Sequence, residues 1–112
     1  MAMCRGGDRF NCIVDGDTIW LNGLNLRLAS YDTPEPYYEI CGGAAEVALA
    51  KRASSRLAQL LNSNAWTVET HGIDSTGERV RATIRIDGRD VGDTLIAEGL
   101  ARSWPDGEEF WC

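Results

Sequence analysis

The chain has 112 residues, of which 44% are hydrophobic and 25% are charged, and its formal net charge is −6. These values are typical of one soluble globular domain spanning residues 1–112, and they exclude a largely disordered chain. The acidic balance argues against a protein that grips nucleic acid by bulk positive charge alone. Ten of the eleven basic residues are arginine, however, which favours fixed bidentate contacts from a local cluster.

Four cysteines in a chain this short indicate a disulfide framework and an oxidising compartment. They are Cys4, Cys12, Cys41 and Cys112. The sequence does not choose among the three pairings, although a Cys4–Cys12 bond would clip residues 1–12 into an irregular opening segment or a short hairpin. No two cysteines have the CxxC spacing and there is one histidine, so zinc is the weaker alternative. No apolar run is long enough to span a membrane and no signal peptide is visible. We therefore expect no membrane contact, and a secreted or periplasmic protein whose leader has been removed.

Residues 13–32 alternate apolar and polar side chains, which predicts two or three strands. The pair Asn22-Gly23 lies between two apolar alternating runs and is a strong signal for a tight hairpin turn. Such a hairpin folds the two ends of this segment towards each other.

Both ends of that segment are acidic, with Asp15 and Asp17 at the start and Asp32 and Glu35 at the close. Carboxylates brought together repel one another and raise each other's pKa unless positive charge lies among them. A divalent cation bound by oxygen ligands is the usual remedy. Each acidic motif alone is equally compatible with an ordinary turn.

After the segment, Pro34 and Pro36 exclude ladder pairing, so residues 33–41 are expected to form a loop. Its tyrosines, Tyr37 and Tyr38, are candidates for the rim of a site. Residues 43–61 have a helical composition with one apolar face. That face comprises Leu49, Ala53, Leu57, Leu60 and Leu61.

The second half of the chain predicts more strands and a short helix. Residues 65–73 and 79–86 alternate, and the turn between them contains Gly77. Residues 91–98 indicate a helix that Gly99 ends. This order of elements favours a small closed or partly open barrel with helices packed on it.

Five motifs follow one another along the chain. They are Val14-Asp15-Gly16-Asp17-Thr18-Ile19, Arg27-Leu28, Asp32-Thr33-Pro34-Glu35, Gly77-Glu78-Arg79 and Glu98-Gly99-Leu100-Ala101. In this order they resemble the staphylococcal nuclease (thermonuclease-like) family, over about residues 11–104. The resemblance implies a mainly β fold with helices, namely a five-stranded OB-fold barrel. The cysteine-rich start and the final Trp-Cys are similar to exported bacterial members of that family.

The resemblance also implies an activity and a set of roles. Asp17 and Asp32, with the backbone carbonyl of Thr33, would bind Ca²⁺. Two further groups would act on the substrate: Glu35 as general base, and Arg27 with Arg79 as ligands of the scissile phosphate. The implied reaction is metal-dependent cleavage of DNA or RNA, with low sequence specificity, leaving 5′-hydroxyl and 3′-phosphate ends. Phosphodiester hydrolysis requires this kind of set, because a positioned water, a base and positive charge on the phosphate oxygens must meet.

Two departures from the family pattern leave alternatives open. The turn before Arg79 is one residue longer than usual, so Arg81, on the same strand face, is the alternative second arginine. The family's base-stacking tyrosines have no counterpart beyond Trp104, which leaves stacking to Trp104, Tyr37 or Tyr38. The alternative function is a noncatalytic OB-fold module that binds nucleic acid or another anionic polymer, such as an acidic polysaccharide. In either case we expect a monomer.

Overall fold

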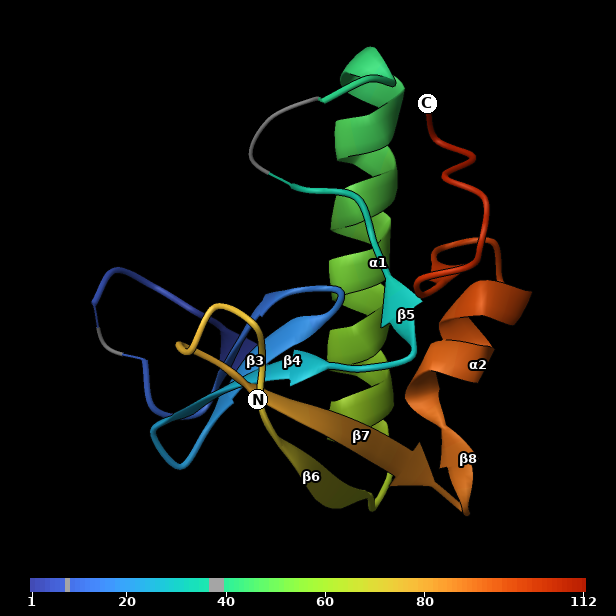
Figure 1. The fold of residues 1–112 in the computed structure, drawn as a ribbon. Helices are drawn as coiled ribbons and strands as arrows, with labels where there is room; N and C mark the ends of the chain where they lie inside the picture. The colour runs from blue at the N-terminus through green and yellow to red at the C-terminus, as the bar shows by residue number, and fades with distance from the viewer. Residues whose placement is uncertain (8, 37–39) are drawn as a thin grey trace.

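The computed structural model describes residues 1–7, 9–36 and 40–112, and most of the strands belong to one mixed sheet (Figure 1). The strands of this sheet pair in the order β1-β2-β3-β4-β7-β6, and β8 pairs with β7. Their bounds are Ala2–Met3 (β1), Cys12–Asp15 (β2), Thr18–Leu21 (β3), Leu24–Leu28 (β4), Thr67–Ile73 (β6), Val80–Ile86 (β7) and Arg89–Asp90 (β8). A second, two-stranded sheet pairs β5 (Tyr31–Asp32) with β9 (Arg102–Ser103). The mainly β character with helices is as predicted. The predicted rim residues Tyr37 and Tyr38 lie outside the described residues.

The predicted hairpin joins β3 to β4. Leu21 pairs with Leu24, so Asn22 and Gly23 form the two-residue turn. Both turn residues have positive φ, 51° for Asn22 and 81° for Gly23. This is the conformation that Asn-Gly adopts readily, and it matches the twist of the flanking strands. From the turn, β4 runs parallel to β7, with Leu26 opposite Val80.

Helix α1 (Gly43–Ser63) lies against one side of the main sheet, and α2 (Val91–Ala97) packs near the ends of β7 and β8 (Figure 1). The apolar face predicted for α1 is buried as expected. Glu46 is also buried at the start of α1, where its Oε1 accepts hydrogen bonds from the backbone N–H groups of residues 40, 41 and 42. Gly99, with φ 74°, follows α2, as predicted for its end. No helix of the described residues is both long and apolar enough to cross a membrane.

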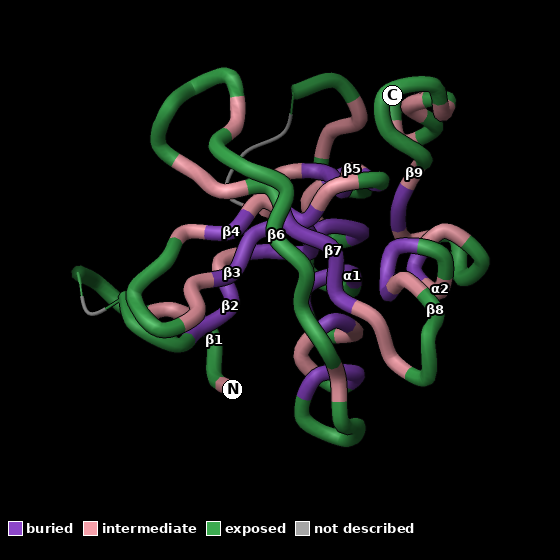
Figure 2. Tube along the Cα trace, turned by 60° about the horizontal axis from the view of Figure 1, so that its bottom comes forward, coloured by how far each residue is buried: buried purple, intermediate pink, exposed green. Residues whose placement is uncertain are grey.

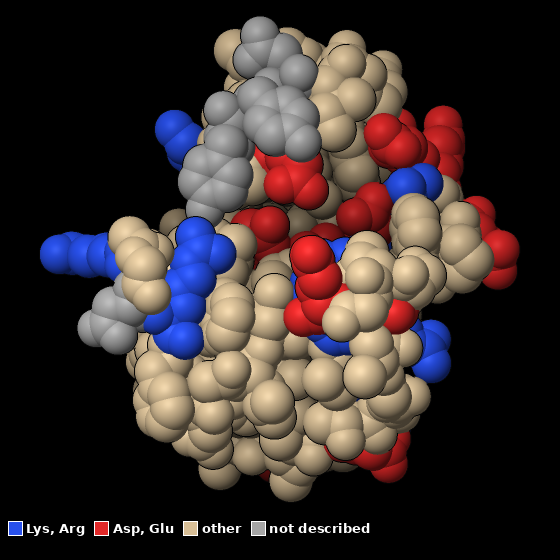
Figure 3. Space-filling model, turned by 60° about the vertical axis from the view of Figure 1, so that its left-hand side comes forward, with Lys and Arg blue, Asp and Glu red and all other residues tan. Residues whose placement is uncertain are grey.

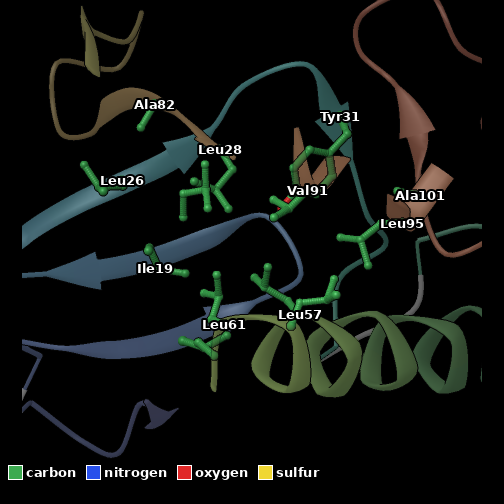
Figure 4. Close-up of a cluster of buried hydrophobic side chains, with 13 residues drawn as sticks. Ile19, Leu26, Leu28, Tyr31, Leu57, Leu61, Ala82, Val91, Leu95 and Ala101 are labelled. Atoms are coloured by element: carbon green, nitrogen blue, oxygen red, sulfur yellow. The ribbon is translucent and has the colours of Figure 1, made fainter. Parts of the chain in front are cut away.

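The core lies between the sheet and the two helices. Figure 4 shows apolar side chains of β3, β4 and β7 on one side and those of α1 and α2 on the other. Tyr31 of β5 is fully buried among them. By contrast, all seven residues of β6 are exposed, as the green tube shows in Figure 2. The core therefore holds β2, β3, β4 and β7 in place, while β6 is fixed through its pairing with β7.

The four cysteines form two disulfides, as their number predicted. They join Cys4 to Cys12 and Cys41 to Cys112. The opening segment is not a hairpin, because β1 runs parallel to β2, with Ala2 opposite Cys12. The second bond joins the segment before α1 to the last residue of the chain.

Candidate functional site

The charged residues singled out in the sequence line one cavity of about 420 Å³. Figure 3 shows acidic side chains in the floor of a hollow, with Lys or Arg side chains on its rim. The charged lining residues are Arg9, Asp15, Asp17, Arg27, Asp32, Glu35 and Arg79. The hairpin thus brings both acidic ends of residues 13–35 together, as predicted. Thr33 lies directly beside Asp17 and lines a smaller neighbouring cavity.

The Asp-Gly-Asp turn after β2 places Asp17 in this cavity. Tyr31 donates a hydrogen bond of 2.6 Å from its hydroxyl to the carbonyl of Gly16, which fixes the turn against the core. Gly16 also lets the turn approach Thr33, since a Cβ at Gly16 would lie 2.8 Å from the Thr33 side chain. In this position the Asp17 carboxylate accepts hydrogen bonds from the N–H of Thr33 at 3.1 Å and the hydroxyl of Thr18 at 3.2 Å.

The carboxylates of the cavity hold an excess of negative charge. The pKa of Asp17 is raised to about 7, first by burial and then by the charge of the neighbouring Asp15, against the Arg27 guanidinium, which lowers it. Burial also raises the pKa of Asp32, against the hydrogen bond from Arg102. The pKa of Glu35 is raised first by burial and then by the charges of Asp17 and Asp32.

The chemistry of this donor set suits a hard divalent cation, although among the described residues the side-chain oxygens of Asp17, Asp32 and Glu35 do not all lie within 4.8 Å of one another. Carboxylate and neutral oxygens are the ligands that Ca²⁺ and Mg²⁺ take. Two buried neutral oxygens, Thr33 Oγ1 and Asn25 Oδ1, have no hydrogen-bond partner among the described residues. Asn25 lines the cavity, and the backbone N–H of Thr33 donates to Asp17. Buried polar atoms are normally satisfied, so these two oxygens are open to a hydrogen-bond donor or to a cation.

Arg27 occupies the centre of the cluster. Its Nη2 lies 3.4 Å from an Asp17 oxygen and 3.5 Å from an Asp32 oxygen. Its Nη1 donates to the backbone carbonyls of Leu28 and Tyr31. The backbone contacts hold the guanidinium plane, while the long carboxylate contacts leave its Nη2 edge available to another anion.

The two candidate arginines of β7 and its preceding turn separate in space. Arg79 lines the cavity that contains Glu35, and Arg79 and Arg81 both line the adjoining cavity. The Nε of Arg79 donates to Asp74 at 3.0 Å. The pKa of Asp74 is lowered, first by the hydroxyl of Thr76 and then by Arg79. The long turn therefore directs Arg79 rather than Arg81 to the acidic cluster.

Arg102 was not among the predicted site residues, and it contacts Asp32 Oδ2 while Arg27 contacts Asp32 Oδ1. Arg102 contacts Asp32 Oδ2 at 2.9 Å and Glu109 at 3.3 Å. Its guanidinium also lies 5.0 Å from the ring of Trp104 and 5.6 Å from that of Trp111. The only sequence signal was its position after the Gly99-Leu100-Ala101 motif. The contact arises because β9 pairs with β5, opposing Asp32 and Arg102.

The chain has a relative of known name. No protein-family model matches the chain. The chain is 35% identical over 92 residues to the succinoglycan biosynthesis protein ExoI of Rhizobium meliloti (strain 1021). The match covers 80% of this chain and 48% of ExoI, so the chain spans about half the length of that relative.

Proposed function

We propose that the protein is a metal-dependent nuclease of the staphylococcal nuclease type, hydrolysing phosphodiester bonds of DNA or RNA with low sequence specificity. One observation carries the proposal: Asp17, Asp32, Glu35, Arg27 and Arg79 line a single cavity. A binding site for phosphate alone would need the arginines, but it would gain nothing from a carboxyl of raised pKa beside them.

The strand order supports an OB-type barrel as the scaffold. Strands β2, β3 and β4 form an antiparallel meander, β4 then pairs in parallel with β7, and β7 pairs with β6. These five are the longer strands of a seven-stranded sheet, which also contains the two-residue strands β1 and β8, and five is the number expected of such a barrel. The helix α1 covers the core beneath them.

Ca²⁺ is the cation we propose for the cluster, held by Asp17, Asp32 and an oxygen of Thr33. When bound, a divalent cation supplies positive charge to the phosphate oxygens and lowers the pKa of water.

The chain's own groups would carry out the remaining chemistry. The Nη2 edge of Arg27 and the free edge of Arg79 would bind non-bridging oxygens of the phosphate and stabilise charge as it develops. Glu35 would accept a proton from the attacking water, whose oxygen forms the new bond to phosphorus. The bond from phosphorus to the 5′ oxygen then breaks, and that oxygen leaves as a hydroxyl once it has gained a proton. A raised pKa makes Glu35 a stronger base than a solvated carboxylate.

The disulfides support a secreted or periplasmic location, because such bonds persist in oxidising compartments. We propose that the protein acts there as a monomer on soluble nucleic acid.

Substitution of Glu35 tests the activity. We expect Glu35→Gln to lower cleavage of single-stranded DNA and RNA in Ca²⁺ by a factor of about 10²–10⁴, the usual contribution of a general base. Calcium affinity, measured by calorimetry, should change little. Glu108→Gln, at an exposed position of the C-terminal segment, is the matched control. Cleavage by wild type that a chelator does not stop, or full activity of Glu35→Gln, would contradict the proposal.

A second candidate is a noncatalytic module that binds an anionic polymer in the same cavity. The observation in its favour is the name of the relative ExoI, which refers to the biosynthesis of a glycan. This candidate predicts Ca²⁺-dependent binding of polyanions and no cleavage of DNA or RNA. The digestion assay with and without chelator separates the two.

A further inference from the structure

Arg9 is a cation of the candidate cavity to which neither the motifs nor the proposed reaction gives a role. It lines the same cavity as Asp17, Glu35 and Arg27. Its Nε donates to the carbonyl of Gly6 at 3.3 Å, and no ion pair among the described residues involves it. An exposed guanidinium with no acidic partner in residues 1–7, 9–36 and 40–112, at the wall of a cavity that also contains carboxyls, can bind an anion.

The loop that carries Arg9 is held at both ends. The Cys4–Cys12 bond closes it over a separation of 8 residues, and Cys12 is buried in β2. On the other side, the N–H of Gly23 donates to the carbonyl of Phe10 at 3.0 Å, and the N–H of Asn22 donates to Asn11 Oδ1 at 2.8 Å. The loop is thus fixed both to β2 and to the turn of the β3–β4 hairpin.

This attachment gives Arg9 a defined place relative to the acidic cluster. Short cross-linked loops have few conformations, so a side chain on one loses less entropy when it binds a ligand. In the proposed reaction Arg27 and Arg79 bind the phosphate that is cleaved. Arg9 is a separate cation at the wall of the same cavity. A ligand that carries more than one negative group, such as a phosphodiester polymer, suits this arrangement of cations.

We propose that Arg9, presented by the loop closed by the Cys4–Cys12 bond, is a subsite for a second phosphate of a phosphodiester polymer. It binds a phosphate adjacent in the chain to the one held by Arg27 and Arg79. This inference rests on the proposed function for the class of ligand. It implies that the site discriminates between a substrate with one phosphodiester and a longer polymer.

The test is the salt dependence of oligonucleotide binding. Labelled oligothymidylate of eight nucleotides is titrated by fluorescence anisotropy in Ca²⁺, with Glu35→Gln as the parent to suppress turnover. For a single strand, each phosphate neutralised contributes about −0.7 to the slope of log K against log salt. We expect Arg9→Ala to flatten the slope by about 0.7 and to weaken binding several-fold, and Arg9→Lys to keep the slope. Arg5→Ala is the matched control, because Arg5 belongs to the same loop, is exposed and does not line the cavity.

Cleavage gives an independent reading. With Glu35 intact, Arg9→Ala should raise KM for the octamer and leave kcat/KM for a dinucleoside monophosphate, which has a single phosphodiester, unchanged. Equal slopes for Arg9→Ala and Arg5→Ala, or an equal loss on both substrates, would overturn the inference, as would a wild type that binds no octamer. If the octamer binds with a slope that depends on Arg9 but is never cleaved, the proposed hydrolysis fails and the subsite stands.

Discussion

The buried carboxyl of Asp17 should make the cation-free protein lose stability as pH rises. Its pKa of about 7 in the folded protein lies above the ordinary value of 3.8. Between these values the folded state binds the proton that the unfolded state has released, so the free energy of unfolding falls with increasing pH. The stability is therefore highest below pH 4 for this group alone, and the loss is complete above about pH 7.

The substitution Asp17→Asn removes this dependence. Each pKa unit corresponds to about 1.4 kcal/mol. The raised pKa of Asp17 therefore lowers the free energy of unfolding by roughly 4 kcal/mol when the group is fully ionised, compared with its value at low pH. At pH 5 the folded Asp17 is still protonated, and the free energy of unfolding is lowered by roughly 1.7 kcal/mol. The asparagine cannot accept as many hydrogen bonds as the carboxylate, and each lost bond costs about 1 kcal/mol at any pH. We therefore expect the stability of Asp17→Asn relative to wild type to rise by roughly 2–3 kcal/mol between pH 5 and pH 8.

Urea unfolding in the presence of chelator at pH 5, 6, 7 and 8 measures this difference. The control is Asp87→Asn, because Asp87 is exposed in the turn after β7 and its φ of 52° suits asparagine. Added Ca²⁺ should stabilise wild type and the control, since a ligand that binds the folded state raises its stability, but not Asp17→Asn. The assignment of a buried, protonated Asp17 would be refuted if the stability of Asp17→Asn relative to wild type did not change with pH, or if it fell as pH rose.

The remaining predictions concern arginines and the longer disulfide. Arg79→Ala should reduce kcat by at least 10²-fold, whereas Arg81→Ala should leave it within a few-fold, because only Arg79 lines the cavity with Glu35; equal losses would mean that the turn is misassigned. Thiol titration of the denatured, unreduced protein should find no free cysteine. The Cys41→Ser/Cys112→Ser variant should lose about 4 kcal/mol of stability, because the Cys41–Cys112 bond closes a long loop. Urea unfolding of this variant at the wild-type concentration would contradict the second prediction. Arg102→Ala should lower calcium affinity and activity together, since the carboxylate it contacts at 2.9 Å loses its anchor; calorimetry that finds wild-type affinity would exclude a positioning role.

Local signals predicted the elements that place the acidic groups. The Asn22-Gly23 turn was predictable because only a few residue pairs readily adopt positive φ at both positions. This preference depends on the two turn residues alone. The apolar face of α1 was equally local, since its repeat follows the helical period. The meeting of the two acidic ends followed from the hairpin alone.

The rest of the site depends on contacts between distant residues. Arg102 meets Asp32 through the pairing of β9 with β5, across 70 positions of sequence, and no local pattern indicates which strand receives β9. The choice between Arg79 and Arg81 depended on how a long turn folds against Asp74. Likewise, the pairing of Cys41 with Cys112 depends on where the C-terminal segment lies, which the spacing of the cysteines does not fix.

The charge of the cavity suggests why the protein can act on a polyanion despite a net charge of −6. Four carboxyls and three arginines line it, so the lining has a charge of about −1 when every group is ionised. Phosphate would be repelled from such a site. Burial first, and neighbouring carboxylates second, raise the pKa values of Asp17 and Glu35, so ionising these groups is costly while no cation is bound. One divalent cation reverses the sign of the lining. Binding of a phosphodiester and binding of the cation should therefore be strongly coupled, and each should raise the affinity for the other by the same factor. A basic nuclease could hold its substrate without metal, whereas here substrate affinity itself should disappear with chelator.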